Sequence, residues 1–132
     1  MADLVIDYTK VREIEVIEQF TGPADEAIEP GAYARLAPAS GKLTNGNATT
    51  AAEVGSGEGI VITRQVNTIT ILKKGIVWLG DALDGLAFGA TVYLSDTDGA
   101  LADAAGTVSK AVGTVVPLFG HDPFRRGLRV AL

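Results

Sequence analysis

Apolar and polar residues alternate over short stretches of this chain, and apolar residues almost never recur with the period of an α-helix. The clearest run is residues 60–72, where β-branched side chains dominate. This density costs a helix side-chain freedom and suits a pleated sheet. Further strands are predicted over 76–79, 91–94, 112–118 and 128–132, and Pro117 should mark a strand edge or end.

Residues 11–20 fit two patterns. Apolar residues at positions 14, 16 and 20 alternate as in a strand, whereas those at 11, 14 and 17 would line one side of a helix. We favour the strand because Gly22-Pro23 ends the run and the neighbouring runs are all β.

Two polar segments are predicted to connect strands. Residues 44–59 contain one large apolar residue, so they are expected to form a mobile surface loop. Lys73-Lys74-Gly75 separates two apolar runs and is predicted to be a hairpin tip.

Two stretches of the chain match at a constant offset of 58 residues. Residues 28–43 align with 86–101 without a gap, and five of the sixteen positions are identical, where composition alone predicts about one. The sequence therefore predicts a small all-β domain, of the β-barrel or β-sandwich kind, with an internal pseudo-repeat. Residues 26–132 form this domain, and residues 1–25 supply an extended N-terminal arm and the first strand.

Composition narrows the function classes. The chain has 132 residues, enough for one domain with its own core, and no cysteine, which excludes thiolate metal sites and disulfides. Net charge is −5, and residues 1–30 carry eight acids against two basic residues. Direct nucleic-acid binding, a secretion signal and a membrane span are not expected. The acidic end is either a solvated surface or a segment that docks on a basic partner.

Candidate catalytic and metal-binding residues are few. An EF-hand loop with its glycine at Gly99 would begin at Leu94 and end at Ala105, and neither of these two end residues supplies the carboxylate that calcium needs there. Asp96–Gly99 is therefore predicted to be a turn. His121 is the single histidine, and no nucleophile elbow accompanies it. We expect no enzyme activity, no metal and no cofactor.

Aromatic and arginine residues indicate a protein contact. Residues 119–127 hold two phenylalanines and two arginines in a turn-rich segment that the first repeat lacks, and such a composition is typical of interfaces. An ordinary loop with inward phenylalanines is the alternative. Trp78 stands alone in a strand, where it serves either the core or an interface.

The second repeat carries a resemblance to a known family. Gly89-Ala90-Thr91-Val92-Tyr93-Leu94, a polar turn, Val112-Gly113-Thr114-Val115 and the final strand Leu128–Leu132 look like the capsid cement, or head decoration, proteins of tailed bacteriophages. The resemblance is clearest over residues 86–132 and does not extend to residues 1–25. It implies a small β domain without catalytic residues, commonly trimeric, that sits on the outer capsid surface of the virion and bridges major capsid subunits.

On this basis the expected partners are the major capsid protein and two further copies of the chain. An N-terminal arm that adds a strand to a capsid sheet edge would supply weak contacts, and linkage of three arms would multiply avidity by roughly 10²–10⁴. The rival functions are a head-fibre base or virion adhesion module, with 44–59 as its tip, and a small β hydrolase or sugar-binding domain. The expected interface residues are Leu4, Val5, Ile6, Tyr8, Trp78, Phe119, Phe124, Arg125 and Arg126.

Overall fold

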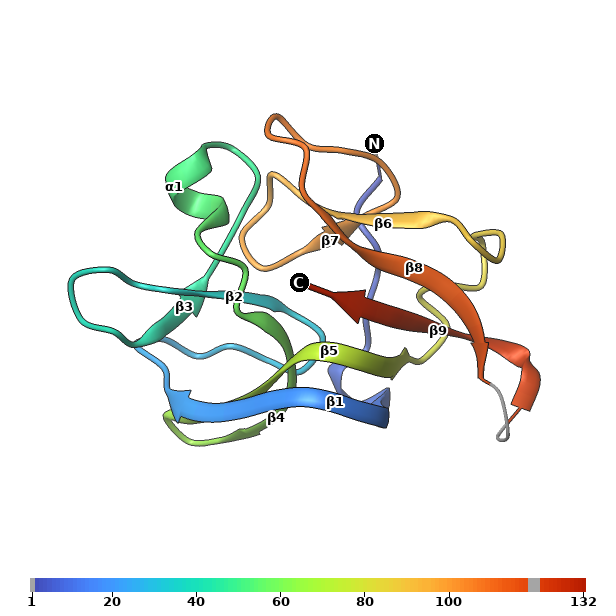
Figure 1. Ribbon diagram of the computed structural model, residues 1–132, viewed down its shortest axis with the longest axis horizontal. Helices are drawn as coiled ribbons and strands as arrows, with labels where there is room; N and C mark the ends of the chain where they lie inside the picture. The colour runs from blue at the N-terminus through green and yellow to red at the C-terminus, as the bar shows by residue number, and fades with distance from the viewer. Residues whose placement is uncertain (1, 119–121) are drawn as a thin grey trace.

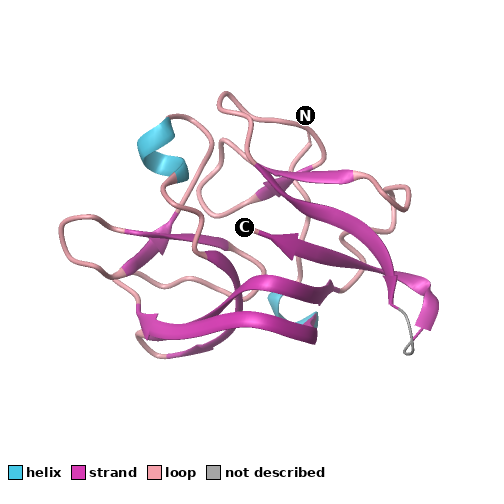
Figure 2. Cartoon of the chain, viewed as in Figure 1, coloured by secondary structure: helices cyan, strands magenta, loops and turns pink. Residues whose placement is uncertain are grey.

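The computed structural model describes residues 2–118 and 122–132, and for 122–124 the backbone alone. These residues form one curled antiparallel sheet, an open half-barrel (Figures 1 and 2). The all-β prediction is confirmed. The strands are β1 (Val11–Pro23), β2 (Tyr33–Leu36), β3 (Leu43–Asn45), β4 (Gly59–Gln65), β5 (Thr68–Leu79), β6 (Thr91–Leu94), β7 (Leu101–Ala102), β8 (Ala111–Leu118) and β9 (Asp122–Ala131). A 3₁₀ turn (Tyr8–Lys10) and a short helix, α1 (Ala51–Val54), complete the elements.

Strand β5 is the centre of the sheet. The strand order is β3-β2-β4-β5-β9-β8-β6-β7, and β1 pairs with β5 outside this path. Along one edge β5 meets β4 at residues 68–72 and β9 at residues 74–77, while β1 follows the other edge over its full length.

The sequence duplication reappears in the fold. Strands β2 and β6 lie at the predicted offset, each forms a hairpin with β3 or β7, and each pairs on its other edge with β4 or β8. The pairing of β1 with β5 in the first repeat then corresponds to the pairing of β5 with β9 in the second repeat. The domain is therefore two similar five-strand units that share β5.

The interior of the half-barrel holds the larger hydrophobic core. It draws buried side chains from nearly every strand, among them Tyr33, Leu72, Val77, Leu94 and Leu128. A second, smaller core lies beside the β4–β5 hairpin and contains Ile28, Leu43 and Ile69. Apart from Tyr33 and a few alanines, both cores consist of branched aliphatic side chains, many of them from alternate strand positions, as the pattern of the sequence predicts.

The prediction of a hairpin tip at Lys73-Lys74-Gly75 is wrong. These residues continue β5, and the β4–β5 turn lies at Val66-Asn67 instead. Glycine is needed at position 75 because a Cβ there would collide with the main-chain oxygen of Glu15 on β1, and its φ is +144°. The polar, glycine-containing run thus marks a close approach of two strands.

The prediction of a mobile loop over 44–59 is also wrong. Within it Asn47, Ala48 and Val54 are buried, and α1 is capped by the Thr50 hydroxyl, which accepts from Glu53 N at 3.2 Å. Backbone hydrogen bonds tie this segment to the second repeat: Ala48 N donates to Ser95 O at 2.8 Å and Gly99 N donates to Gly46 O at 2.7 Å. The segment therefore joins the two units, and the rival adhesion module loses the projecting tip that it requires.

Candidate partner-binding surfaces

The N-terminal strap, residues 2–10, is paired with its own domain. Leu4 N donates to Leu101 O at 2.8 Å, and Asp103 N donates to Ala2 O at 3.1 Å, so the strap extends the sheet beyond β7. Asp3 forms an isolated antiparallel bridge with Ala102. The arm predicted from sequence is thus an added strand of the same body.

Side chains of the strap alternate between the core and solvent. Leu4 and Ile6 are partly buried against the larger core, whereas Val5 is 90% exposed and Tyr8 is 52% exposed. Gly31 makes room for the strap, because a Cβ at that position would lie 2.7 Å from Ile6 Cγ2. Two of the four predicted contact residues therefore anchor the strap, and the other two are available to a partner.

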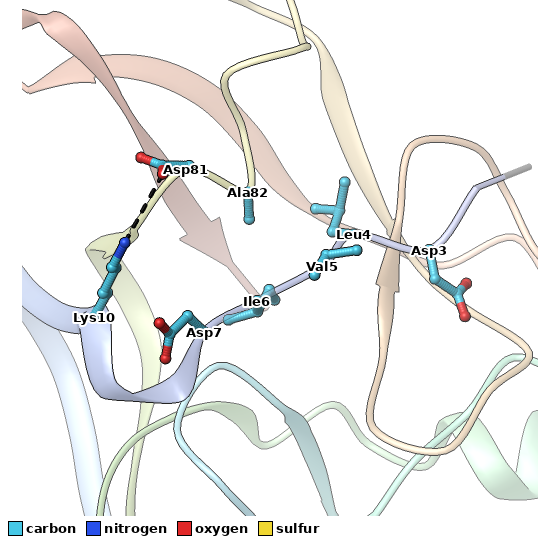
Figure 3. A pocket seen from close by; sticks show the side chains of 8 residues that line it. All are labelled: Asp3, Leu4, Val5, Ile6, Asp7, Lys10, Asp81 and Ala82. Atoms are coloured by element: carbon cyan, nitrogen blue, oxygen red, sulfur yellow. Dashed lines mark ion pairs between the residues drawn. The ribbon is translucent and has the colours of Figure 1, made fainter.

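Three shallow hollows follow the strap. The first, about 520 Å³, is lined by strap residues 3–7 together with Lys10, Asp81 and Ala82, and an ion pair of 3.9 Å joins Lys10 Nζ to Asp81 (Figure 3). The second, about 330 Å³, lies on the other side of Leu4 and Ile6 and reaches Tyr8. The third, about 390 Å³, lies between Tyr8 and Val66. We call the area of these hollows the strap surface.

The end of the strap is held by local polar contacts. Asp7 accepts hydrogen bonds from the backbone N–H of Thr9, at 3.0 Å, and from its hydroxyl, at 2.6 Å. Because both bonds favour the charged carboxylate, they lower the pKa of Asp7. The 3₁₀ turn that presents Tyr8 is therefore capped at neutral pH.

Two adjacent arginines of β9 each form a cation–π pair, one with a ring on β5 and one with a ring in the β5–β6 connection. The Arg125 guanidinium lies 5.2 Å from the centre of the Trp78 ring, and that of Arg126 lies 4.4 Å from the centre of Phe88. Arg126 Nε also donates to Leu86 O at 2.7 Å. The structure thus brings together three of the predicted interface residues and adds Phe88, which sequence reasoning missed. Phe119 and His121 lie outside the described residues, as does the side chain of Phe124.

The long strand β1 is exposed on both of its faces. Ile17 is 68% exposed, and Val16 and Phe20 are 39% and 38% exposed. Register shifts at Ile14 and Ile17 place a bulge at each of these residues. Bulges and charges protect an edge strand from pairing with another strand. We define Glu13, Glu15, Val16, Ile17 and Glu18 as the β1 rim.

A cationic face covers the outside of β5 and β9. Val77 and Leu79 point into the core, so Ile76 and Trp78 point outward and are half-buried. Ile76 lies opposite Arg129 on β9. We define this face as Lys74, Ile76, Trp78, Arg125 and Arg129.

Polar groups inside the domain serve its structure. Hydrogen bonds from the Thr44 hydroxyl and from Asn45 lower the pKa of Glu26, and burial raises the pKa of Tyr33 to about 12. The Tyr33 hydroxyl donates to Val54 O at 2.7 Å. Within the described part of the chain, no group of three or more histidine or acidic side chains could hold a metal ion.

Among residues 2–118 and 122–132, no helix has the length and hydropathy of a membrane-spanning segment. Comparison of the chain with protein-family models, with curated proteins and with solved structures finds no match.

Proposed function

We propose that this chain is a decoration protein that binds the outer surface of a tailed-phage head and bridges neighbouring major capsid subunits. The resemblance of residues 86–132 to cement proteins supports this proposal. The observation that carries it is the strap surface, where exposed Val5, Tyr8 and Val66 accompany three adjoining hollows. Exposed apolar side chains beside such hollows are typical of surfaces that bind another protein.

The paired state of the strap determines how it would bind. A free arm that adds a strand to the shell would first have to leave β7 and withdraw Leu4 and Ile6 from the core. The docked strap needs no such ordering, so its exposed side chains enter the contact without that entropic cost. Docking of a preformed surface is therefore favoured over strand addition.

Repetition would give the contact its strength. In the proposed homotrimer, three strap surfaces on one rigid body convert the second and third contacts into intramolecular events, which raises avidity by roughly 10²–10⁴. Each surface would rest on a different capsid subunit, so the trimer would oppose separation of the subunits.

Co-sedimentation with undecorated, expanded heads of the source phage tests the proposal. Wild-type protein is expected to bind at a fixed ratio to the major capsid protein, and Val5→Glu is expected to weaken binding at least about tenfold, because it places a charge on the contact. Leu36→Glu is the matched control, since Leu36 is 37% exposed and lines none of the three hollows. Wild-type protein that stays in the supernatant would refute the function. Equal binding of Val5→Glu would refute the strap surface alone.

A further inference from the structure

The connection between β5 and β6 contains an exposed aspartate that is followed by glycine, Asp84-Gly85. In such a pair the side-chain carboxyl can react with the next backbone amide, because glycine has no Cβ to hinder the approach. Asparagine before glycine reacts in the same way. The chain has two further pairs of this kind, Asn45-Gly46 and Asp98-Gly99, and the structure holds the three pairs differently.

The Asp98-Gly99 pair is held on both sides of the bond that would react. Gly99 is buried, and its N–H donates to Gly46 O at 2.7 Å. The carboxylate of Asp98 accepts from Asn47 Nδ2 at 2.6 Å. Reaction at this pair therefore requires the segment to open first.

The Asn45-Gly46 pair is held in a similar way. Gly46 is buried, and its N–H donates to Tyr33 O at 3.3 Å. The side-chain amide of Asn45 donates to Glu26 Oε1 at 3.0 Å. Reaction at this pair likewise requires local opening.

The Asp84-Gly85 pair has neither restraint. Both residues are exposed, and a Cβ on Gly85 would meet no atom within 4 Å outside its chain neighbours. Among the described residues, neither Gly85 N nor the Asp84 carboxyl has a hydrogen-bond or ion-pair partner. Leu86 N, by contrast, donates to Leu83 O at 3.0 Å. The turn thus leaves the reacting amide unbonded beside an unbonded carboxyl.

We propose that Asp84 is a site of isoaspartate formation in the folded protein. Gly85 N attacks the carbon of the protonated Asp84 carboxyl, the C–OH bond breaks, and the hydroxyl leaves with the amide proton as water, which gives a cyclic succinimide. Water then opens the ring. Cleavage of the bond between Gly85 N and the main-chain carbonyl carbon of Asp84 gives isoaspartate, whereas cleavage of the newly formed bond restores aspartate.

The product changes the surface beside β9. Isoaspartate adds one carbon atom to the main chain between Leu83, which is fully buried, and Leu86, whose carbonyl accepts from Arg126 Nε at 2.7 Å. Asp84 also lines a hollow of about 400 Å³ together with Trp78 and Arg126. Net charge stays the same, so the longer main chain alone displaces the carbonyl that holds Arg126. This surface therefore changes with the age of the protein.

Ageing of the purified protein in neutral buffer, below its melting temperature, tests the proposal. Enzymatic methylation of the free α-carboxyl of isoaspartate, followed by peptide mapping with mass spectrometry, locates each modified residue. In the folded protein, isoaspartate at Asp84 should form at least about tenfold faster than at Asp98, because reaction at Asp98 waits for local opening. In the chain unfolded by guanidinium chloride, the two rates should be similar, since both residues precede glycine.

Two variants and one optical signal complete the test. Gly85→Ala should slow the reaction at Asp84, because the added Cβ hinders the attack, and Ala87→Ser is the control, an exposed change in the same connection that should leave the rate unchanged. Thermal melting checks that both variants fold. Trp78 is the single tryptophan, and its fluorescence should shift as isoaspartate accumulates.

Three results would overturn the proposal. Equal rates at Asp84 and Asp98 in the folded wild type would do so, and this comparison needs no variant. Isoaspartate at Asp84 that appears in the unfolded chain alone, or an unchanged rate in folded Gly85→Ala, would also do so. Unchanged fluorescence of the fully modified protein would overturn the claim about the surface. The measurement contains no capsid, so its result is independent of the test of the proposed function.

Discussion

Replacement of Ile6 by alanine distinguishes a docked strap from a free arm. The change removes three carbon atoms from a side chain that is partly buried against the larger core. At about 0.8 kcal/mol for each fully buried methylene, and with most of that group buried, the free energy of unfolding should fall by about 1.5–2 kcal/mol. For a domain of this size, that loss lowers the melting temperature by about 5–7 °C.

Val5→Ala is the control, because Val5 is its neighbour in the strap and is 90% exposed. Its free energy of unfolding should change by less than about 0.5 kcal/mol. Urea unfolding at one fixed protein concentration measures both variants, since self-association would otherwise shift the midpoint. Equal stability of Ile6→Ala and wild type would show that the strap does not pack on the body in solution, and the reasoning about a preformed surface would fail with it.

Three further outcomes follow from the fold. Gly75→Ala should destabilise the domain by about 2–4 kcal/mol in denaturant unfolding, because a Cβ would meet the Glu15 main chain, and an unchanged midpoint would contradict that approach of β1 to β5. Thr44→Val should raise the pKa of the Glu26 carboxyl in an NMR titration. The pKa of Glu26 is lowered from 4.5 in the folded state, so the charged carboxylate stabilises the fold above about pH 4.5, and this stabilisation is lost as pH falls through the folded value. The variant should therefore lose less stability on acidification than the wild type. Identical titrations of the Glu26 carboxyl in the two proteins would argue against the Thr44 bond. The amide of Ala48 should exchange slowly with deuterium, since it is buried and bonded to Ser95 O, and rapid exchange would restore the mobile loop.

The parts of the fold that depend on local pattern were predictable from sequence. Strand β6 occupies 91–94 as predicted, β1 ends at Pro23, and the offset of 58 residues places β2 and β6 in equivalent positions. In β1 and β6 the β-branched residues favour a strand, and Gly22-Pro23 ends β1.

The errors arose where distant contacts outweigh local composition. Lys73-Lys74-Gly75 has the residues of a turn, but pairing with β1 and β9 keeps it extended. Ala48 is small, so a count of large apolar residues overlooks it, although it is fully buried between the two units. Neither the packing of a small residue nor the pairing of strands about 50 positions apart leaves a recognisable pattern in the local sequence.

The candidate surfaces were only partly predictable. Val5 and Tyr8 are exposed in the strap, and Trp78, Arg125 and Arg126 line one hollow. The β1 rim was missed, because alternation along a strand predicts one buried face, and only the strand order reveals that β1 lies at an edge with both faces bare.

The double membership of β5 has a mechanical consequence. Neither unit can separate from the other without loss of β5, which both units need. The domain should therefore unfold as a whole and has no hinge between the two units. Tension that entered at β1 would load the long β1–β5 ladder in shear, and β5 would pass the force to β9 through its opposite edge. A domain built in this way transmits force from one unit to the other through β5 and does not open between the two units.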